Sequence, residues 1–296
     1  MEKLLLIVNP CSGRAKMRGE LLSVVEILSK KYIVTVYPTK SRGDATNIVS
    51  KLKADEYSVI VVCGGDGTLN EVISGLMLSG NRTTLGYIPS GTLNEWSSGL
   101  RIPRTIKEAA TAILDGEEID LDIGKFDNKF FSYTASFGAF TDASYSAPQD
   151  VKNVLGQAAY FFEGIKSLGN IKPIHLKFST DEREVEGNFI FGAISNSFSV
   201  GGVVKLDSND VELDDGVFEV LLIHYPDNII KLQPLIDGIM KRDFDREGIE
   251  FFKADKITVS GGKYVSWTLD GEYAQGMEEL QVENLHSAIH LIVPKE

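Results

Sequence analysis

The chain has 296 residues, enough for two ordinary domains or one large one, and 43% of them are hydrophobic, as in soluble globular proteins. Thirty basic and 42 acidic residues give a formal net charge of −12, which disfavours nucleic-acid binding and firm adhesion to anionic membranes. The longest apolar runs are strand-sized and follow no targeting leader, so we expect a cytoplasmic protein.

Strand-like and helix-like segments alternate over the first part of the chain. Continuous aliphatic runs predict strands buried on both faces, and apolar residues at helical spacing predict helices between them. We expect strands at residues 3–8, 33–37, 58–63 and 84–88, and helices at 16–30, 44–52 and 68–78. This alternation is typical of a parallel sheet with flanking crossover helices, an α/β domain.

The pattern changes after about residue 120 to short strands separated by Gly, Asp and Asn turns. We expect strands at residues 129–136, 174–178, 184–195, 217–224, 256–260 and 264–269, with helices near 153–168 and 229–240. This predicts a β-rich second domain, a sandwich or a barrel. The expected domains are residues 1–122 and residues 123–287, and a final strand in 288–296 either returns to the first domain or closes the second.

Three polar, glycine-containing turns follow predicted strands of the first domain. They are Asn9-Pro10-Cys11-Ser12-Gly13, Gly64-Gly65-Asp66-Gly67-Thr68 and Pro89-Ser90-Gly91-Thr92-Leu93-Asn94. The carboxyl ends of parallel strands are where open α/β sheets bind their ligands. We therefore expect the three turns to form one binding site.

Phosphate is the ligand that such turns suit. Glycines let backbone amides approach an anion, a following helix adds the positive end of its dipole, and Ser12, Thr68 and Thr92 can add hydroxyl donors. Asp66 would repel a bare phosphate, so its presence predicts a bridging cation, Mg²⁺. The alternative is that Gly-Gly-Asp-Gly is an ordinary turn. Neither the dinucleotide fingerprint nor the Gly-Lys-Ser/Thr loop is present.

These motifs resemble the catalytic domain of the diacylglycerol kinases, in particular the bacterial soluble enzymes and their lipid-kinase relatives. The resemblance rests on Gly64-Gly65-Asp66-Gly67-Thr68 with Asn70-Glu71, and on Asn9-Pro10-x-Ser12-Gly13. It continues in Pro89-x-Gly91-Thr92-x-Asn94, Leu121-Asp122-Ile123-Gly124, Leu213-Asp214-Asp215-Gly216 and Leu269-Asp270-Gly271-Glu272. Sphingosine kinases belong with this family, and NAD kinases and phosphofructokinases share the glycine loop more distantly. The motifs cover nearly the whole chain in order.

The resemblance implies which residues hold the cofactors ATP and Mg²⁺. ATP is implied to contact the three loops and Thr39, which follows the second strand. The implied contacts are Asn9, Pro10, Cys11, Ser12, Gly13, Thr39, Gly64, Gly65, Asp66, Gly67, Thr68, Leu69, Asn70, Glu71, Gly91, Thr92 and Asn94. Glu95 departs from the family pattern, which often has Asp there.

Four acidic residues are implied to be catalytic. Asp66 would organise the catalytic Mg²⁺ with Asp122 nearby, and Glu272 matches the general base that takes a proton from the lipid hydroxyl. Asp270, two residues earlier on an extended strand, would face the same side as Glu272 and act with it. The alternative reading of Asp270-Gly271-Glu272 is the tip of a hairpin.

A second metal site is implied at Asp215. In the family this side chain acts with main-chain carbonyl groups, here those of Glu212 and Val217. The resulting site would be structural. Without the resemblance, Leu213-Asp214-Asp215-Gly216 reads as a common turn between strands.

Two further patterns have ordinary interpretations. His286 and His290 are four residues apart, but residues 285–293 alternate like a strand, so we interpret them as surface or interface histidines. An apolar stripe at residues 158–162 is expected to pack in the core, with a membrane-dipping lip as the alternative.

The sequence thus predicts an ATP-dependent lipid kinase that phosphorylates diacylglycerol in transient contact with the inner face of the membrane. Another lipid alcohol, such as a sphingoid base or phosphatidylglycerol, remains open as the acceptor. A kinase of a soluble alcohol, such as NAD or a sugar phosphate, is the second reading, and a nucleotide-binding regulator without turnover is the third. An exposed edge strand could also pair across a homodimer.

Overall fold

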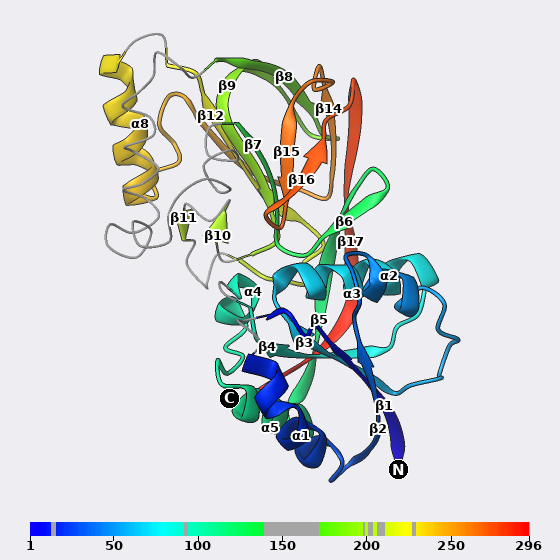
Figure 1. The fold of residues 1–296 in the computed structure, drawn as a ribbon. Helices are drawn as coiled ribbons and strands as arrows, with labels where there is room; N and C mark the ends of the chain where they lie inside the picture. Colours follow the sequence, from blue (N-terminus) through cyan, green and yellow to red (C-terminus); the bar gives the residue numbers. More distant parts are fainter. Residues whose placement is uncertain are drawn as a thin grey trace. The chain divides into compact units, whose positions relative to one another are not determined.

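The computed structural model describes residues 1–12, 16–91, 94–138, 172–197, 199–200, 204–205, 211–226 and 229–295. The chain divides into two units, residues 1–123 with 286–296, and residues 124–285. Both are visible in Figure 1, and two strands, β5 (Glu117–Phe126) and β17 (Glu279–Val293), contribute to both units. The predicted loop residues Gly13 and Thr92, the 153–168 helix and the 158–162 stripe lie outside the described residues.

The first unit is an α/β domain, as predicted. Strands β1 (Glu2–Val8), β2 (Tyr32–Pro38), β3 (Val59–Gly64) and β4 (Thr84–Pro89) pair in the order β4-β3-β1-β2, and all these pairings are parallel. The aliphatic runs of β1 and β3 are buried along almost their whole length. Strand β17 joins the sheet beside β4 at Leu291.

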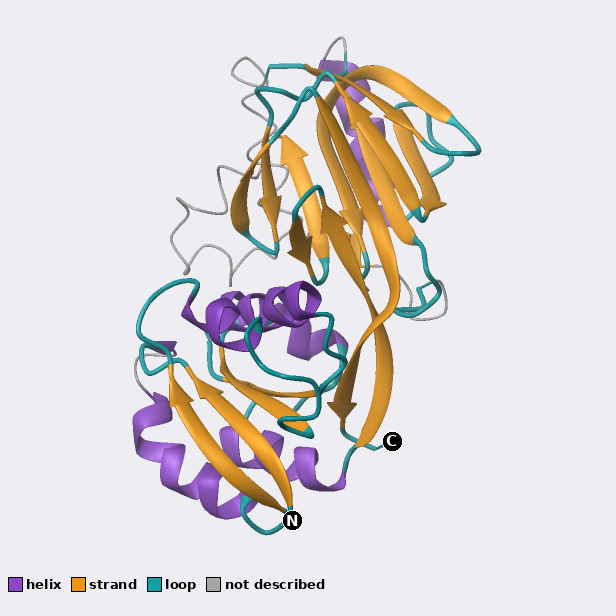
Figure 2. Ribbon diagram, turned by 90° about the vertical axis from the view of Figure 1, so that its right-hand side faces the viewer, coloured by secondary structure: helices purple, strands orange, loops and turns teal. Residues whose placement is uncertain are grey.

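Helices cover both faces of this sheet (Figure 2). They are α1 (Lys16–Leu28), α2 (Asp44–Val49), α3 (Asp66–Ser79), α4 (Glu95–Gly99) and α5 (Ile106–Asp115). Helices α2 and α3 pack closely at Gly75, where an added Cβ would lie 2.7 Å from Cβ of Val49. Helices α4 and α5 and strand β5 were not predicted from the sequence.

The second unit is β-rich, with β6 (Lys129–Phe131), β7 (Thr134–Gly138), β8 (Ile174–Ser179), β9 (Glu184–Ser195), β12 (Phe218–His224), β13 (Ile249–Ala254), β14 (Lys256–Ser260), β15 (Ser266–Leu269) and β16 (Glu272–Gln275). A short pair, β10 (Ser199–Val200) and β11 (Val204–Lys205), and helix α8 (Ile229–Lys241) also belong to it. The pairings described are antiparallel, in contrast to the first unit. This confirms the predicted second fold class.

Two hydrophobic clusters build the second unit. The larger is rich in aromatic residues, with Phe137 and Trp267 4.8 Å apart between ring centroids. The smaller uses the other face of β9 and β12 and is covered by Leu235 and Ile239 of α8. Side chains point to alternate faces along a strand, so β9 and β12 each contribute residues to both hydrophobic clusters.

Candidate active site

The carboxyl ends of β2, β1, β3 and β4 lie side by side in the first unit. Backbone hydrogen bonds connect the residue after one strand to the end of its neighbour: Thr39 N to Val8 O at 2.8 Å, Asn9 N to Cys63 O at 2.9 Å, and Ser90 N to Gly64 O at 2.8 Å. The three polar turns, with Thr39 beside them, consequently begin at one edge of the sheet.

The turns also touch one another. Asn9 Nδ2 donates to Thr68 Oγ1 at 3.0 Å. A Cβ added at Gly91 would lie 2.6 Å from Cα of Gly65, and one added at Gly65 would lie 3.9 Å from Oγ of Ser12. Side chains larger than hydrogen are therefore excluded where the second and third turns meet. The result is a cradle lined by backbone, of the kind that holds phosphate groups.

Asp66 begins α3 at this cradle. Its helix has 14 residues and starts after Gly65, so the positive end of the helix dipole points at the same edge of the sheet. The side chain of Asp66 is partly exposed, and its Oδ1 atom is buried. A carboxylate is an oxygen donor of the type that Mg²⁺ prefers. The residues present thus fit a magnesium-bound triphosphate.

Other predicted nucleotide contacts hold the scaffold together. Both carboxylate oxygens of Glu71 accept backbone amides at the start of α2, from Gly43 at 2.7 Å and from Ala45 at 3.2 Å. The Leu69 side chain is buried, and the Asn70 side chain accepts from Ser74 Oγ at 3.4 Å. Nucleotide contact by these three stays a prediction, and the structure gives Glu71 a capping role.

The remaining members of the first and second turns lie at the surface or near it. Cys11 is exposed, and its amide donates to Asn9 Oδ1 at 3.0 Å, which closes a small turn. Pro10 and Ser12 are partly exposed, and Gly67 is exposed. These residues are accessible to a ligand in the cradle.

Asp122 lies on β5 within the first unit and is 1% exposed. Its Oδ1 accepts the backbone amide of Ser287 at 2.7 Å and lies 3.1 Å from Nδ1 of His286. His290 makes a similar contact with Asp120. The sequence pattern predicted ordinary surface or interface histidines at both positions. The structure instead connects one of them to a predicted catalytic carboxylate.

Asp270 and Glu272 do not share an extended strand, so that expectation was wrong. Asp270 and Gly271 have φ of 49° and 82° and form the two-residue turn between β15 and β16, which is the hairpin alternative. Leu269 pairs with Glu272 across this turn. The two carboxylates differ accordingly, since Asp270 is 7% exposed and Glu272 is exposed on β16.

The Asp270 carboxylate holds another segment of the second unit. It accepts backbone amides from Ser132 at 2.6 Å, Tyr133 at 3.0 Å and Thr134 at 3.1 Å. These bonds interrupt the predicted strand at 129–136 and leave two shorter strands, β6 and β7. Asp270 thus fixes the turn that carries Glu272 and does not present its own carboxylate at the surface.

Asp270→Asn is expected to lower the free energy of unfolding by about 2–4 kcal/mol, because the side-chain amide offers one acceptor oxygen to three backbone N–H groups. Asn tolerates positive φ, so the backbone preference is kept. Asp127→Asn is the matched control, since Asp127 also has a positive φ, of 52°, in a turn of the same unit. Urea denaturation measures both variants, and equal stabilities would contradict this account.

Comparisons with known proteins assign the chain to a family. Residues 3–126 match the model of the diacylglycerol kinase catalytic domain, and residues 135–293 match that of the YegS C-terminal NAD kinase beta sandwich-like domain. A diacylglycerol kinase of Bacillus subtilis (strain 168) is 32% identical over 298 residues, covering 100% of this chain and 98% of that protein. The chain belongs to the diacylglycerol kinase family.

Further relatives agree with this assignment. A diacylglycerol kinase of Staphylococcus aureus (strain MRSA252) is 31% identical, over 98% of this chain and 92% of that protein. A crystal structure described as a diacylglycerol kinase from Bacillus anthracis str. Sterne superposes with a TM-score of 0.79 at 27% identity, over 99% of this chain and 97% of that one. The chain is accordingly a kinase, of a family of lipid kinases. None of its helices, over the residues that the structure describes, is long and apolar enough to span a membrane.

In the turn predicted to bind the second metal, the side chain of Asp215 pairs with a lysine ammonium group. Asp215 Oδ1 accepts the Val217 amide at 3.1 Å, and its Oδ2 lies 3.1 Å from Nζ of Lys253. The same ammonium lies 3.2 Å from Oε1 of Glu219, whose side chain is 1% exposed. No group of three His, Cys, Asp or Glu side chains suited to a metal occurs in the described ranges. A metal at Asp215 would therefore depend on carbonyl oxygens, such as those of Glu212 and Val217.

Glu219 makes the stability of the second unit depend on pH. Burial raises the pKa of Glu219 to about 7, and Lys253 opposes this shift. The pKa of Glu219 is higher in the folded chain than in the unfolded chain, so the folded chain holds the proton more tightly. Protonated Glu219 therefore stabilises the fold fully when the pH is below the unfolded pKa, and this stabilisation is lost as the pH rises through the folded pKa of about 7. From pH 5 to 8 we expect wild type to lose about 2–3 kcal/mol of unfolding free energy relative to Glu219→Gln. Chemical denaturation at several pH values measures the difference. Unfolding free energies of wild type and Glu219→Gln that change in parallel with pH would contradict this prediction.

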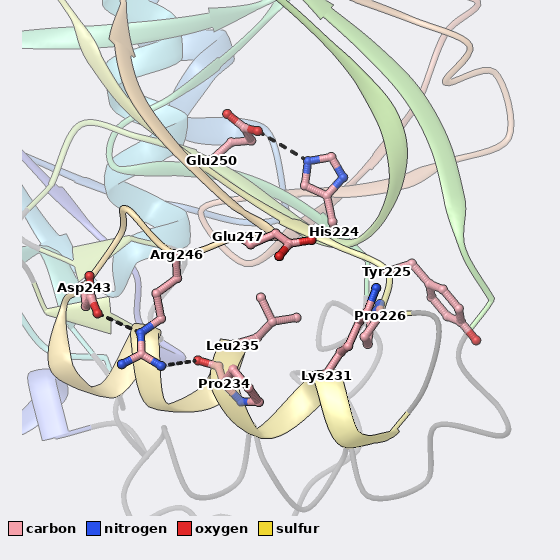
Figure 3. Close-up of a pocket in the computed structure, with 11 residues that line it drawn as sticks. His224, Tyr225, Pro226, Lys231, Pro234, Leu235, Asp243, Arg246, Glu247 and Glu250 are labelled. Carbon is pink, nitrogen blue, oxygen red and sulfur yellow. Dashed lines mark hydrogen bonds and ion pairs between the residues drawn. The ribbon is translucent and has the colours of Figure 1, made fainter.

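A pocket of about 720 Å³ lies elsewhere in the second unit, beside α8 (Figure 3). Ion pairs at its wall join Arg246 to Asp243 at 2.7 Å and His224 to Glu250 at 3.6 Å. The lining is His224, Tyr225, Pro226, Lys231, Pro234, Leu235, Asp243, Arg246, Glu247, Gly248 and Glu250. Five of these eleven residues carry charged side chains, and Tyr225, Pro226, Pro234 and Leu235 add apolar surface.

Proposed function

We propose that this kinase transfers the γ-phosphoryl group of ATP to the hydroxyl of diacylglycerol and forms phosphatidic acid. The observation that carries the proposal is the convergence of the three glycine turns on one backbone cradle beside Asp66. Curated relatives that match the chain over nearly its full length are named for the same acceptor. The geometry of the cradle supports ATP as the phosphate donor, and the names of the relatives support diacylglycerol as the acceptor.

On the donor side, backbone amides around Gly65 and Gly91 bind the phosphate oxygens, and Asn9, Ser12, Thr39 and Thr68 supply side-chain donors. The carboxylate of Asp66 holds Mg²⁺, which neutralises charge on the phosphate oxygens when bound. Asp122 is proposed as a further catalytic carboxylate. Its contacts with Ser287 and His286 fix its orientation.

On the acceptor side, Glu272 accepts the proton of the lipid hydroxyl as the oxygen attacks the γ-phosphorus in line, and ADP leaves. The carboxylate is exposed and follows a turn that Asp270 anchors through three backbone amides. A rigid support of this kind keeps a base in position without strain on the reacting groups. Asp270 therefore contributes by positioning Glu272.

We also propose that Asp215, with the carbonyl groups of Glu212 and Val217, binds a structural divalent cation. The side chain of Asp215 is mostly buried in an acidic turn, which suits a cation. Lys253 already pairs with it, and a metal would have to share or displace this contact. Thermal unfolding with Mg²⁺ and with EDTA tests the proposal on wild type and Asp215→Asn. A rise in the unfolding temperature with Mg²⁺ that occurs in wild type but not in Asp215→Asn supports the proposal. An unfolding temperature that does not depend on the metal in either protein opposes it.

The acceptor is tested by competition. The protein is incubated with γ-labelled ATP and vesicles that contain diacylglycerol, a sphingoid base and phosphatidylglycerol, with NAD and fructose 6-phosphate in solution. Phosphatidic acid is the expected labelled product. Labelled phosphate in another lipid would identify that lipid as the acceptor. Labelled phosphate in a soluble product would show that the acceptor is not a lipid. A protein that binds ATP and transfers no phosphate would be a regulator.

Peripheral contact with the inner face of the membrane follows from a lipid acceptor, and vesicle flotation measures it. Self-association is proposed through β2, an edge strand of the first unit's sheet that has exposed Ile33 and Val36. Sedimentation of wild type and Val36→Lys tests it. A dimer that Val36→Lys weakens supports the proposal, and a monomeric wild type rejects it.

A further inference from the structure

The hydroxyl of Tyr87 lies buried beneath the turns that follow β3 and β4. Tyr87 is 1% exposed, and its hydroxyl lies 3.4 Å from the carbonyl oxygen of Gly64 and 3.3 Å from Oδ1 of Asn94. The carboxylate of Asp66 lies close enough to raise the pKa of this hydroxyl. The phenol hydrogen therefore faces acceptors from both turns, with the Asp66 carboxylate nearby. None of the family motifs quoted above includes this residue.

Asn94 extends the connection into the cradle. Its Oδ1 accepts the Gly91 amide at 2.9 Å, and its Nδ2 donates to the Gly91 carbonyl at 3.1 Å. Gly91 is the residue whose Cα approaches Gly65 too closely for a side chain. Trp96 packs edge-on against the Tyr87 ring, with centroids 6.3 Å apart, and limits its movement. The phenol is thus fixed between the sheet and the two turns.

We propose that Tyr87 is a positioning residue whose hydroxyl orients Asn94 towards the phosphate cradle and Asp66 towards the cation. Without this donor, the oxygens of Gly64, Asn94 and Asp66 would face one another with no hydrogen between them, and the two turns would move apart. Burial, and then the charge of Asp66, raise the pKa of Tyr87 far above its usual range. The hydroxyl therefore keeps its proton under assay conditions. The inference rests on the proposed function, because it assigns the cradle to ATP.

Tyr87→Phe removes the hydroxyl and retains the ring. We expect the KM for Mg·ATP and the Mg²⁺ concentration for half-maximal rate each to rise about 10-fold, the effect of losing one hydrogen bond to a charged group. Tyr32→Phe is the control, because Tyr32 is 3% exposed in β2 of the same unit.

Calorimetric titration with Mg·AMP-PNP separates this inference from the identity of the acceptor. Wild type that binds the nucleotide but phosphorylates no lipid would defeat the proposed function, and the relative affinities of the two variants would still decide the role of Tyr87. Unchanged nucleotide affinity and unchanged Mg²⁺ dependence in Tyr87→Phe would overturn the inference. So would an equal loss in Tyr32→Phe, a wild type without nucleotide affinity, or a Tyr87→Phe protein that no longer unfolds cooperatively.

Discussion

Glu272→Gln is expected to lower kcat for lipid phosphorylation by about 10²–10⁴-fold, the usual contribution of a general base. Glutamine keeps the shape of the side chain but cannot accept the proton of the attacking hydroxyl. The residue is exposed on β16, so the fold should tolerate the change. Nucleotide affinity should be retained, because the phosphate cradle belongs to the first unit. Steady-state kinetics with nucleotide titration measures both quantities.

Glu279→Gln is the matched control, since Glu279 is also an exposed glutamate at the start of a strand. It should turn over like wild type. A Glu272→Gln enzyme with unchanged kcat would remove the proposed base. A variant that lost nucleotide affinity in proportion to turnover would instead indicate a binding role.

Asp66→Asn is expected to lower kcat/KM for Mg·ATP by about 10³-fold, a magnitude typical of losing a central electrostatic group. The amide has nearly the same volume but no charge to balance a divalent cation. Because the side chain lies at the start of α3, its neutral form also removes a favourable interaction with the helix dipole, worth about 0.3–1 kcal/mol in stability. Initial rates over a range of Mg²⁺ concentrations measure the effect.

Asp115→Asn serves as the control, because Asp115 is an exposed carboxylate in the same unit, at the end of α5. Its rates should equal those of wild type. An Asp66→Asn enzyme with the wild-type dependence on Mg²⁺ would contradict the assignment of this carboxylate to the cation.

The sequence was sufficient for the features that arise from local periodicity. Aliphatic runs predicted β1, β2, β3 and β4, and the alternation with helices predicted their parallel pairing. A parallel sheet gathers the carboxyl ends of its strands, so the convergence of the glycine turns followed from the same reasoning. The antiparallel second unit was likewise readable from short strands and turn residues.

Features that depend on contacts distant in sequence were not predictable in this way. The strand at residues 129–136 divides because Ser132, Tyr133 and Thr134 donate amides to Asp270, which is more than 130 positions away. Lys253 reaches Asp215 and Glu219 for a similar reason, since β12 and β13 are neighbours only in the folded chain. No local pattern encodes these pairings.

Two local signals in the sequence indicate structure that strand and helix periodicity does not. Thr105 accepts the amide of Glu108 and donates to its carboxylate at 2.6 Å, a capping box that marks the start of α5. Asp270-Gly271 is the dipeptide that two-residue hairpins favour, and it argued against an extended strand. The hairpin alternative given by this dipeptide is the one that the structure shows, whereas the expectation of a shared strand came with the catalytic pairing of Asp270 and Glu272.

We propose that the glycine cradle and Glu272 act in one reaction, the phosphorylation of diacylglycerol. Mass spectrometry of lipid products measures this reaction with Mg·ATP, vesicles with or without diacylglycerol, and wild type or Glu272→Gln. We predict phosphatidic acid only where wild type, ATP and diacylglycerol are all present. Wild type that consumes ATP at the same rate without diacylglycerol, or forms no phosphatidic acid from it, would contradict the account.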